Sequence, residues 1–338
     1  MQGELRMLAA LALALPLAAQ EGIVARGFEH FYNLEYDEAI ADFSEAVARH
    51  PDLPSVHNHL AQAILYRAMF RAGALESELV TGNNPFLRRP KVEATPEEDQ
   101  RFRRAVQKSM ELCQARVKQN PRDTAALYAL GVAHGWRANY NFLVRKAWRD
   151  ALRDATSARK LHNKVSDLDP SAIDARLMQG VHDYVVGSLP LLWKMLGFLI
   201  GFRGDKEQGI RTLELVAQKG VVNREDARIL LCAIYRREKR PQQAVPLLEE
   251  LIRRFSRNYL LYLELAQMHS ELGDKTKALA ALRQLQTLKE SGAPGFARLP
   301  WGRLWYAEGN VQFWYNDLDA ALENMKKATG GADALDLN

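Results

Sequence analysis

A short pattern of residues occurs twice in this chain at a fixed offset of 34 residues, between Arg228 and Leu285. A period in this range is typical of a helical-repeat array, in which each unit is a pair of helices that cannot bury its hydrophobic face alone. Neighbouring units must therefore stack in order along the chain. The matched positions are Leu231 with Leu265, Cys232 with Ala266, Tyr235 with His269, Ala244 with Ala278, and Leu248 with Leu282.

The composition agrees with a folded helical protein. Hydrophobic residues make up 47% of the 338 residues and charged residues 26%, which allows a large core. Val, Ile and Thr form no alternating runs of the kind that strands require, so we expect an all-α chain. Of the two cysteines, Cys232 occupies the small position of its unit, which predicts a buried thiol rather than a bonded or reactive one. The place of Cys113 is not constrained in this way.

The same residues resemble the tetratricopeptide repeat family, whose 34-residue helix-turn-helix unit has small, aromatic and bulky residues at set intervals. A further match follows residue 20, where residues 36–40 have the form of the family's turn and second-helix start. The resemblance implies an α-solenoid, a right-handed superhelix of antiparallel helix pairs. The matching residues of this first unit are Gly27, His30, Tyr36, Ala39, Phe43, Ala46 and Pro51.

The spacing divides residues 21–338 into seven expected units, with an inserted loop and an inserted helix. The loop occupies residues 73–95. At its end, Thr95 followed by Pro96 and Glu98 predicts a helix N-cap with a capping box. The expected units are 21–52, 53–121, 122–170, 171–222, 223–257, 258–290 and 301–331.

Residues 1–20 have the form of a secretory signal peptide. Arg6 precedes an apolar run at residues 7–15, and small residues follow that run. We therefore expect cleavage near Ala19 or Gln20, and an exported protein that is periplasmic or secreted in a bacterial-type cell. The alternative is that the segment forms a first repeat helix, since Ala and Leu favour helices.

Residues 185–202 are the most apolar part of the remaining chain. Pro190 and Lys194 interrupt them, and a central Lys costs roughly 2.5–3.5 kcal/mol on insertion scales, which disfavours a membrane span. We favour an inserted helix that packs across the superhelix, and residues 188–216 resemble the inclusion-body clearance family of tetratricopeptide proteins in a way that supports it. The alternative is a lipid- or membrane-associated envelope adaptor with a lipid-facing or hydrophobic-ligand surface. Its contact residues would be Leu192, Trp193, Leu196 and Phe198.

The sequence contains no recognisable catalytic or metal-binding motif. It has no Gly-rich phosphate loop, paired-Cys motif, Gly-x-Ser-x-Gly elbow or His-Glu-x-x-His pattern. His30, His134 and His269 occupy the same aromatic position of different units, so each is expected to pack within its own helix pair. The 46 basic and 41 acidic residues are not clustered as nucleic-acid binding requires. We expect no enzyme, metal, cofactor or nucleic-acid partner, the alternative being an enzyme with a repeat-built pocket.

In such an array the first helices of the units line a concave groove, where side chains not needed for packing can meet an extended peptide or a helix. Aromatic residues there would anchor apolar side chains, and Arg236 would bind a carboxylate. The alternative for each is ordinary packing between repeats. We predict a non-enzymatic scaffold that binds a protein or peptide partner. The groove-facing candidates are Phe28 and Phe31 in the first unit, Tyr128, Val132 and Trp136 in the third, Arg236 in the fifth, and Leu263, Gln267 and Ser270 in the sixth.

Overall fold

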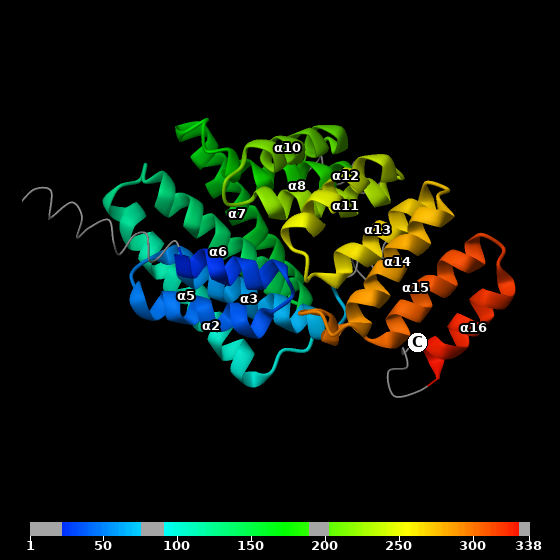
Figure 1. The fold of residues 1–338 in the computed structure, drawn as a ribbon. Coiled ribbons are helices and arrows are strands. Elements are labelled where there is room, and N and C mark those ends of the chain that lie inside the picture. The colour runs from blue at the N-terminus through cyan, green and yellow to red at the C-terminus, as the bar shows by residue number, and fades with distance from the viewer. Residues whose placement is uncertain (1–21, 76–90, 189–202, 331–338) are drawn as a thin grey trace, which may run out of the picture. The chain divides into compact units, whose positions relative to one another are not determined.

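The computed structural model describes residues 22–75, 91–188 and 203–330, and every regular element in these ranges is a helix (Figure 1). The chain divides into two compact bodies, each with its own internal contacts. The N-terminal body comprises the described residues up to Val221, and the C-terminal body comprises residues 222–330.

The N-terminal body is a series of helices in which each packs on a neighbour in the chain. Residues 22–32 form its first helix. The two helices of the third predicted unit, α6 and α7, are longer than those of most other pairs. The helices after the first are α2 (Tyr36–Arg49), α3 (Pro54–Arg71), α5 (Pro96–Gln119), α6 (Thr124–Leu143), α7 (Trp148–Leu168), the 3-10 helix η2 (Ile173–Ala175), α8 (Arg176–Gly187) and α10 (Lys206–Lys219).

The C-terminal body continues the same pattern with three helix pairs that follow one another in order (Figure 1). The first helices of consecutive pairs also meet directly, since α13 contacts α15. The elements are α11 (Arg224–Arg237), α12 (Pro241–Arg254), α13 (Tyr259–Glu271), α14 (Lys275–Glu290), the 3-10 helix η3 (Phe296–Arg298), α15 (Trp301–Trp314) and α16 (Leu318–Thr329).

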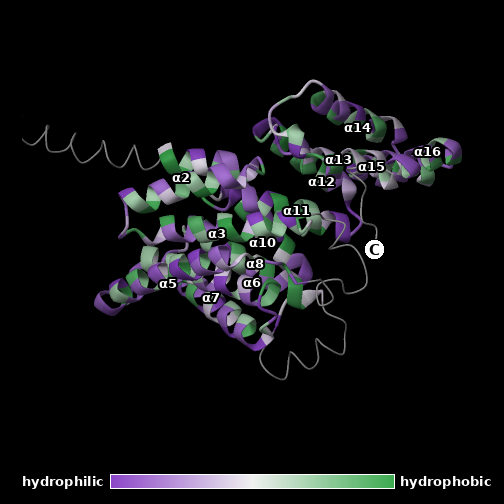
Figure 2. Cartoon of the chain, turned by 90° about the horizontal axis from the view of Figure 1, so that it is seen from below, coloured by the Kyte–Doolittle hydropathy of each residue, from purple (hydrophilic) through white to green (hydrophobic). Residues whose placement is uncertain are grey.

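The helices are two-faced, with hydrophilic and hydrophobic residues on the same element (Figure 2). In α2, Tyr36, Ile40 and Phe43 recur at three- and four-residue intervals and are at most 4% exposed. Asp37 and Glu38 lie between them and are exposed. This spacing places one apolar stripe along the helix, and burying that stripe against the neighbouring helices is what stabilises the pair.

Glycines, including Gly27 at its predicted small position, let the helices approach closely. A Cβ atom on Gly27 would lie 2.5 Å from the ring of Phe43, and a Cβ atom on Gly209 would lie 2.4 Å from the backbone nitrogen of Tyr184. Separations this short are incompatible with close packing of an L side chain. The small residues that the repeat spacing selects are therefore required by contact between helices.

The end of the first helix has the same backbone conformation in five of the described repeats. A residue in the left-handed region follows the first helix, and the next N–H donates to the carbonyl five residues earlier, as from Asp274 to His269 at 3.0 Å. This is a Schellman motif, which satisfies carbonyls at the helix end. The left-handed residues are Leu34 (φ 63°), Gly73 (φ 63°), Lys239 (φ 56°), Gly273 (φ 83°) and Asn316 (φ 60°). Equivalent turn residues in the C-terminal body are therefore separated by 34 residues between Lys239 and Gly273 and by 43 residues between Gly273 and Asn316.

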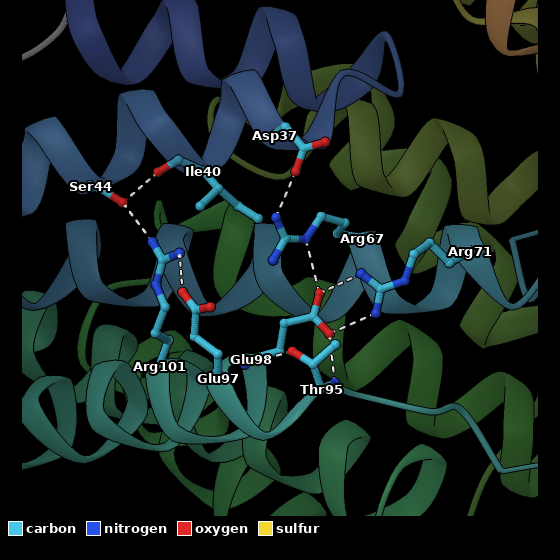
Figure 3. Close-up of polar contacts among 9 residues, drawn as sticks. All are labelled: Asp37, Ile40, Ser44, Arg67, Arg71, Thr95, Glu97, Glu98 and Arg101. Carbon is cyan, nitrogen blue, oxygen red and sulfur yellow. Dashed lines mark hydrogen bonds and ion pairs between the residues drawn. The ribbon is translucent and has the colours of Figure 1, made fainter.

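Helix α5 begins with the predicted capping box. The Thr95 hydroxyl accepts a hydrogen bond from the Glu98 N–H at 3.2 Å, and the Glu98 carboxylate accepts one from the Thr95 N–H at 2.8 Å. The same buried carboxylate accepts from Arg67 at 3.0 Å and twice from Arg71 at 2.6 Å (Figure 3). Glu98 therefore ties the start of α5 to the end of α3. The middle of the predicted inserted loop, residues 76–90, lies outside the described residues.

Electrostatics show that Glu98 is charged in the folded protein. Burial disfavours its ionised form, but the hydrogen bonds from Arg71 and from the Thr95 backbone outweigh burial and lower the pKa of Glu98 to about 2. The carboxylate is therefore ionised at neutral pH.

Candidate functional site

The predicted groove candidates lie on the first helices of the repeats. In the N-terminal body these helices are residues 22–32, α3 and α6, and in the C-terminal body they are α11, α13 and α15. We call the side chains that link successive first helices within one body its first-helix surface.

Aromatic rings join the first helices of the N-terminal body. The ring of Phe31 lies 4.8 Å from that of Tyr66 in α3, and Tyr66 lies 6.0 Å from Trp136 in α6, measured between centroids. Phe28 lies 4.8 Å from His59, also in α3. Phe31 is only 3% exposed, whereas the other four residues are half-buried. The structure thus brings the candidates Phe28, Phe31 and Trp136 into one cluster through Tyr66, which the sequence analysis did not select.

Tyr128 packs inside its own repeat instead. Its ring is stacked on that of His162 in α7, with centroids 5.2 Å apart and planes 9° apart. Burial lowers the pKa of His162 to about 4, so the imidazole is neutral at physiological pH. Val132 is half-buried on the same helix as Tyr128. The stacking with a second helix accounts for Tyr128 as a packing residue.

Charged side chains join the first helices of the C-terminal body. Arg236 is 7% exposed and donates to Glu264 at 3.0 Å and to Glu271 at 3.3 Å, both on α13. Gln267 donates to the same Glu271 carboxylate at 3.1 Å. The carboxylate that Arg236 was predicted to bind is therefore supplied by its own chain. Leu263 on the same helix is half-buried.

Trp314 at the end of α15 is the most exposed aromatic side chain for which burial is described, at 70%. Trp314 on α15 occupies the same repeat position as Glu271 on α13, 43 residues earlier. Glu271 contacts Arg236 on α11, the first helix of the repeat before α13. The adjacent Tyr315 hydroxyl donates to the Ser270 carbonyl at 3.0 Å, which joins the ends of α13 and α15. The sequence analysis missed Trp314, although the offset from Ala278 to Ala321 would have located it.

The three predicted histidines are tied to their own helix pairs in two different ways. The Nδ1 atom of His30 lies 2.8 Å from a carboxylate oxygen of Asp42, and Nδ1 of His134 lies 3.0 Å from one of Asp154. His269 is simply buried, at 8% exposed. The described residues contain no cluster of three or more His, Cys, Asp or Glu side chains able to hold a metal ion.

Buried Asp154 is held in its charged form by its neighbours. Burial disfavours the ionised carboxylate, but hydrogen bonds from His134 and Arg137 outweigh this and lower the pKa of Asp154 to about 2. Arg137 donates to both carboxylate oxygens, at 2.6 and 2.8 Å, and Asn141 donates at 3.1 Å. An ionised, fully paired aspartate of this kind stabilises the hairpin and has no proton to exchange near neutral pH.

Both cysteines are free thiols in buried positions, which agrees with the prediction for Cys232. Burial raises the pKa of Cys113 to about 11 and raises that of Cys232 far above its usual value. Because the thiolate is the reactive form, these cysteines are poor nucleophiles at neutral pH.

Two predicted segments lie outside the described residues. One is the leader, residues 1–20, and the other contains the candidate lipid-contact residues Leu192, Trp193, Leu196 and Phe198. Among the helices that are described, none combines the length and the apolar character needed to cross a bilayer.

Comparison with known proteins identifies the repeats that gave the 34-residue offset. A family model for the tetratricopeptide repeat matches residues 234–293, which span most of the fifth predicted unit and the whole sixth. A search of curated proteins gave no match.

Solved structures of tetratricopeptide proteins give weak overall superpositions. TTC0263 from Thermus thermophilus is 14% identical, with 74% of this chain and 98% of that chain covered at a TM-score of 0.37. A tetratricopeptide repeat protein from Parabacteroides merdae is 13% identical, with 92% of each chain covered at 0.34. Yeast Tom70 is 12% identical, with 92% of this chain and 85% of that chain covered at 0.32.

Proposed function

We propose that this all-α chain, which carries tetratricopeptide repeats at residues 234–293, is a scaffold that binds a protein or peptide partner on the first-helix surface of its C-terminal body. The observation that carries the proposal is Trp314, which is 70% exposed at the end of α15. The next residue, Tyr315, joins this end of α15 to the end of α13 through its hydrogen bond to the Ser270 carbonyl.

An exposed tryptophan suits a binding anchor. Trp buries a large apolar area with few rotatable bonds and is enriched among the residues that dominate interface energies. Leaving it in water forgoes roughly 2 kcal/mol of apolar burial, which a partner's apolar side chain would recover. The surface therefore favours a partner that presents a large apolar residue to Trp314.

The polar residues on the first helices before α15 are already held in place. Arg236, Gln267 and Glu271 form a hydrogen-bonded set across α11 and α13, so little side-chain freedom remains to be lost on binding. Such a set offers fixed donors and acceptors to the backbone of an extended peptide or to the polar face of a helix. Arg236 orients these carboxylates instead of receiving one from the partner.

The N-terminal body provides a weaker case for a binding surface. Its linking aromatics are mutually packed, and Phe31 is 3% exposed. Burial of this kind fits cohesion between repeats. We therefore assign the partner to the C-terminal body first.

Site-specific photocrosslinking in the full chain tests the proposal. We place a photoreactive phenylalanine at Trp314 and, as the matched control, at Gln284, an exposed residue on the second helix α14. A discrete crosslinked partner is expected in source-cell extract at position 314 only. Trp314→Ala should then weaken binding of that partner about 30-fold, as an anchor worth about 2 kcal/mol predicts. Equal labelling at both positions, or unchanged affinity in the variant, would refute it.

We also propose that the scaffold is not a catalyst. This rests on the two buried thiols and on the histidines, which are tied to aspartates or packed in the helix pair. A broad screen of hydrolase and transferase substrates tests this part of the proposal. Turnover of any compound would overturn it, provided that the activity disappears when the purified chain is unfolded and is therefore not due to a contaminant.

Export is proposed for residues 1–20 on the strength of the charged start and the apolar run. Cell fractionation combined with N-terminal sequencing tests it. A periplasmic or secreted chain that begins near Glu21 is the expected result, and a cytoplasmic chain that retains residue 2 or Met1 would contradict it.

A further inference from the structure

The described part of the C-terminal body ends in an exposed apolar face. Leu318 and Leu322, one helical turn apart on α16, are 53% and 55% exposed. Phe313, at the end of α15, is 55% exposed. We call these three residues the end face. In a soluble chain, adjacent large apolar side chains left this open mark an interaction site.

The end face corresponds to a contact that is filled in the repeats before it. Arg236 occupies the position of Phe313 two repeats earlier, and it is buried against α13 of the following repeat. Lys275 occupies the position of Leu318 one repeat earlier, 43 residues before, and pairs with Asp317 of the following repeat at 2.9 Å. These positions therefore stack on the next repeat wherever a next repeat follows.

Charge on α16 selects the occupant. Asp319 and Lys326 are both exposed and lie seven residues apart, which is two helical turns, so they share one flank of the leucine stripe. In a pair of antiparallel α16 helices related by a two-fold axis near Leu322, like flanks face each other and Asp319 meets Lys326 of the other copy. A parallel two-fold pair would instead set this flank against the opposite one, which carries Ala321 and Met325 and no charge, so Asp319 and Lys326 would gain no partner from the other copy.

We propose that the end face is a self-association surface, on which a second copy of this chain packs with its α16 antiparallel to the first. The contact is isologous, so each copy contributes the same leucines and both Asp319–Lys326 pairs form. The arrangement is closed at two copies. Phe313 also contacts the ring of Trp314, with centroids 5.9 Å apart, so the end face borders the proposed partner-binding surface. The leucines and the charged pair lie on α16, and variants there test self-association without changing Trp314.

Sedimentation velocity of the full chain over a range of concentrations tests the proposal first. A monomer–dimer equilibrium is expected for the natural chain, and Leu318→Glu with Leu322→Glu should leave a monomer. Leu152→Glu, at an equally exposed leucine in the N-terminal body (55%), should leave the dimer unchanged. A natural chain that stays monomeric at all concentrations, or a dimer that survives the double change, overturns the proposal.

Charge reversal tests the antiparallel geometry without touching the leucines. Asp319→Lys alone and Lys326→Asp alone should each weaken the dimer severalfold, and the two changes together should restore it. Circular dichroism confirms that each variant is folded. Failure of the double reversal to restore the dimer would refute the antiparallel pairing.

Discussion

The two bodies fill equivalent repeat positions with opposite chemistry. Phe31 lies four residues after the small residue of its first helix, as Arg236 does, and Tyr66 lies five residues after its small residue, as Glu271 does. In the N-terminal body these positions meet as two aromatic rings, and in the C-terminal body they meet as an ion pair. The repeat therefore fixes which positions touch and leaves the type of contact free.

The difference has thermodynamic consequences. Ring packing gains from apolar burial and depends little on salt, whereas an ion pair must offset the desolvation of both charges. We expect the first-helix contacts to hold the N-terminal body together and to orient side chains in the C-terminal body. The predictions below test this contrast, beginning with the largest effect. Because repeat arrays can unfold in parts, hydrogen exchange resolved by body is the preferred measurement.

Phe31→Ala should cause the largest loss. It removes a 3% exposed ring that contacts Phe28, Tyr36 and Tyr66, and truncating a buried Phe typically costs about 3–5 kcal/mol. Exchange protection should fall in the N-terminal body and stay unchanged in residues 222–330. Arg236→Ala, the equivalent change in the C-terminal body, should cost about half as much because Glu264 and Glu271 keep some contact with water. Equal losses of stability in Phe31→Ala and Arg236→Ala would contradict the proposed difference between the two bodies.

Glu98→Gln should come next, because the N-terminal body also contains deeply buried carboxylates and Glu98 is one of them. The change leaves Arg67 and Arg71 without their carboxylate, at an expected cost of about 2–4 kcal/mol in the free energy of unfolding. Asp37→Asn serves as the control, since Asp37 pairs with Arg67 but is 75% exposed, and should cost less than about 1 kcal/mol.

The same glutamate predicts a pH dependence. Its folded pKa of about 2 lies below the ordinary value of 4.5, so its stabilising contribution is complete above pH 4.5 and is lost as the pH falls towards 2. Between these values the natural chain should lose stability more steeply than Glu98→Gln does. Parallel acid-unfolding curves of the two proteins would contradict this assignment.

Substitutions at the left-handed residue of the shared turn should change stability in a direction that depends on how buried that residue is. Lys239→Gly removes a non-glycine residue from the left-handed region at an exposed site and should add about 1 kcal/mol of stability. Gly273→Ala should remove about as much, since a Cβ there meets no atom within 4 Å and only backbone strain remains. Leu34→Gly should be destabilising in spite of its φ of 63°, because Leu34 is 5% exposed. Thermal unfolding of the three variants measures the order.

Transplanting the aromatic contact should have the smallest effect on stability. Arg236→Phe with Glu271→Tyr installs the residue types of the equivalent positions Phe31 and Tyr66, and Glu264→Gln removes the remaining charge of the ionic set. Replacing buried ion pairs with packed apolar groups is often neutral, so a change within about 1 kcal/mol is expected, together with a weaker dependence on salt. A loss greater than about 3 kcal/mol would show that the ionic set is structurally essential.

The sequence predicted the elements that depend on local chemistry. The capping box at Thr95 and Glu98 was found because its residues are three apart and satisfy one another. The burial of Cys232 followed from its place at a small position. The Glu98–Arg71 pair was not predicted, because α3 and α5 are separated by an insertion and nothing local relates their side chains.

The contacts of the binding candidates depend on neighbouring helices, and whether these residues bind a partner stays a prediction. The spacing correctly placed Phe31 and Arg236 on first helices, but it could not show that each is buried against the next repeat. Tyr128 was selected by the same rule and stacks on His162 of its own hairpin. Trp314 was missed because the last repeat is displaced by a longer linker, so its register becomes clear only when Ala321 is matched to Ala278.

By itself the sequence determined that this chain folds as paired helices in a repeated register, because periodic apolar and small residues act over one or two turns and need no knowledge of distant contacts. Only the tertiary structure decided which side chains on the first helices are used up in joining repeats and which remain open. That distinction depends on what the following repeat places opposite each residue. At Arg236 the next repeat supplies two carboxylates, whereas in the last described repeat Phe313, Leu318 and Leu322 remain exposed.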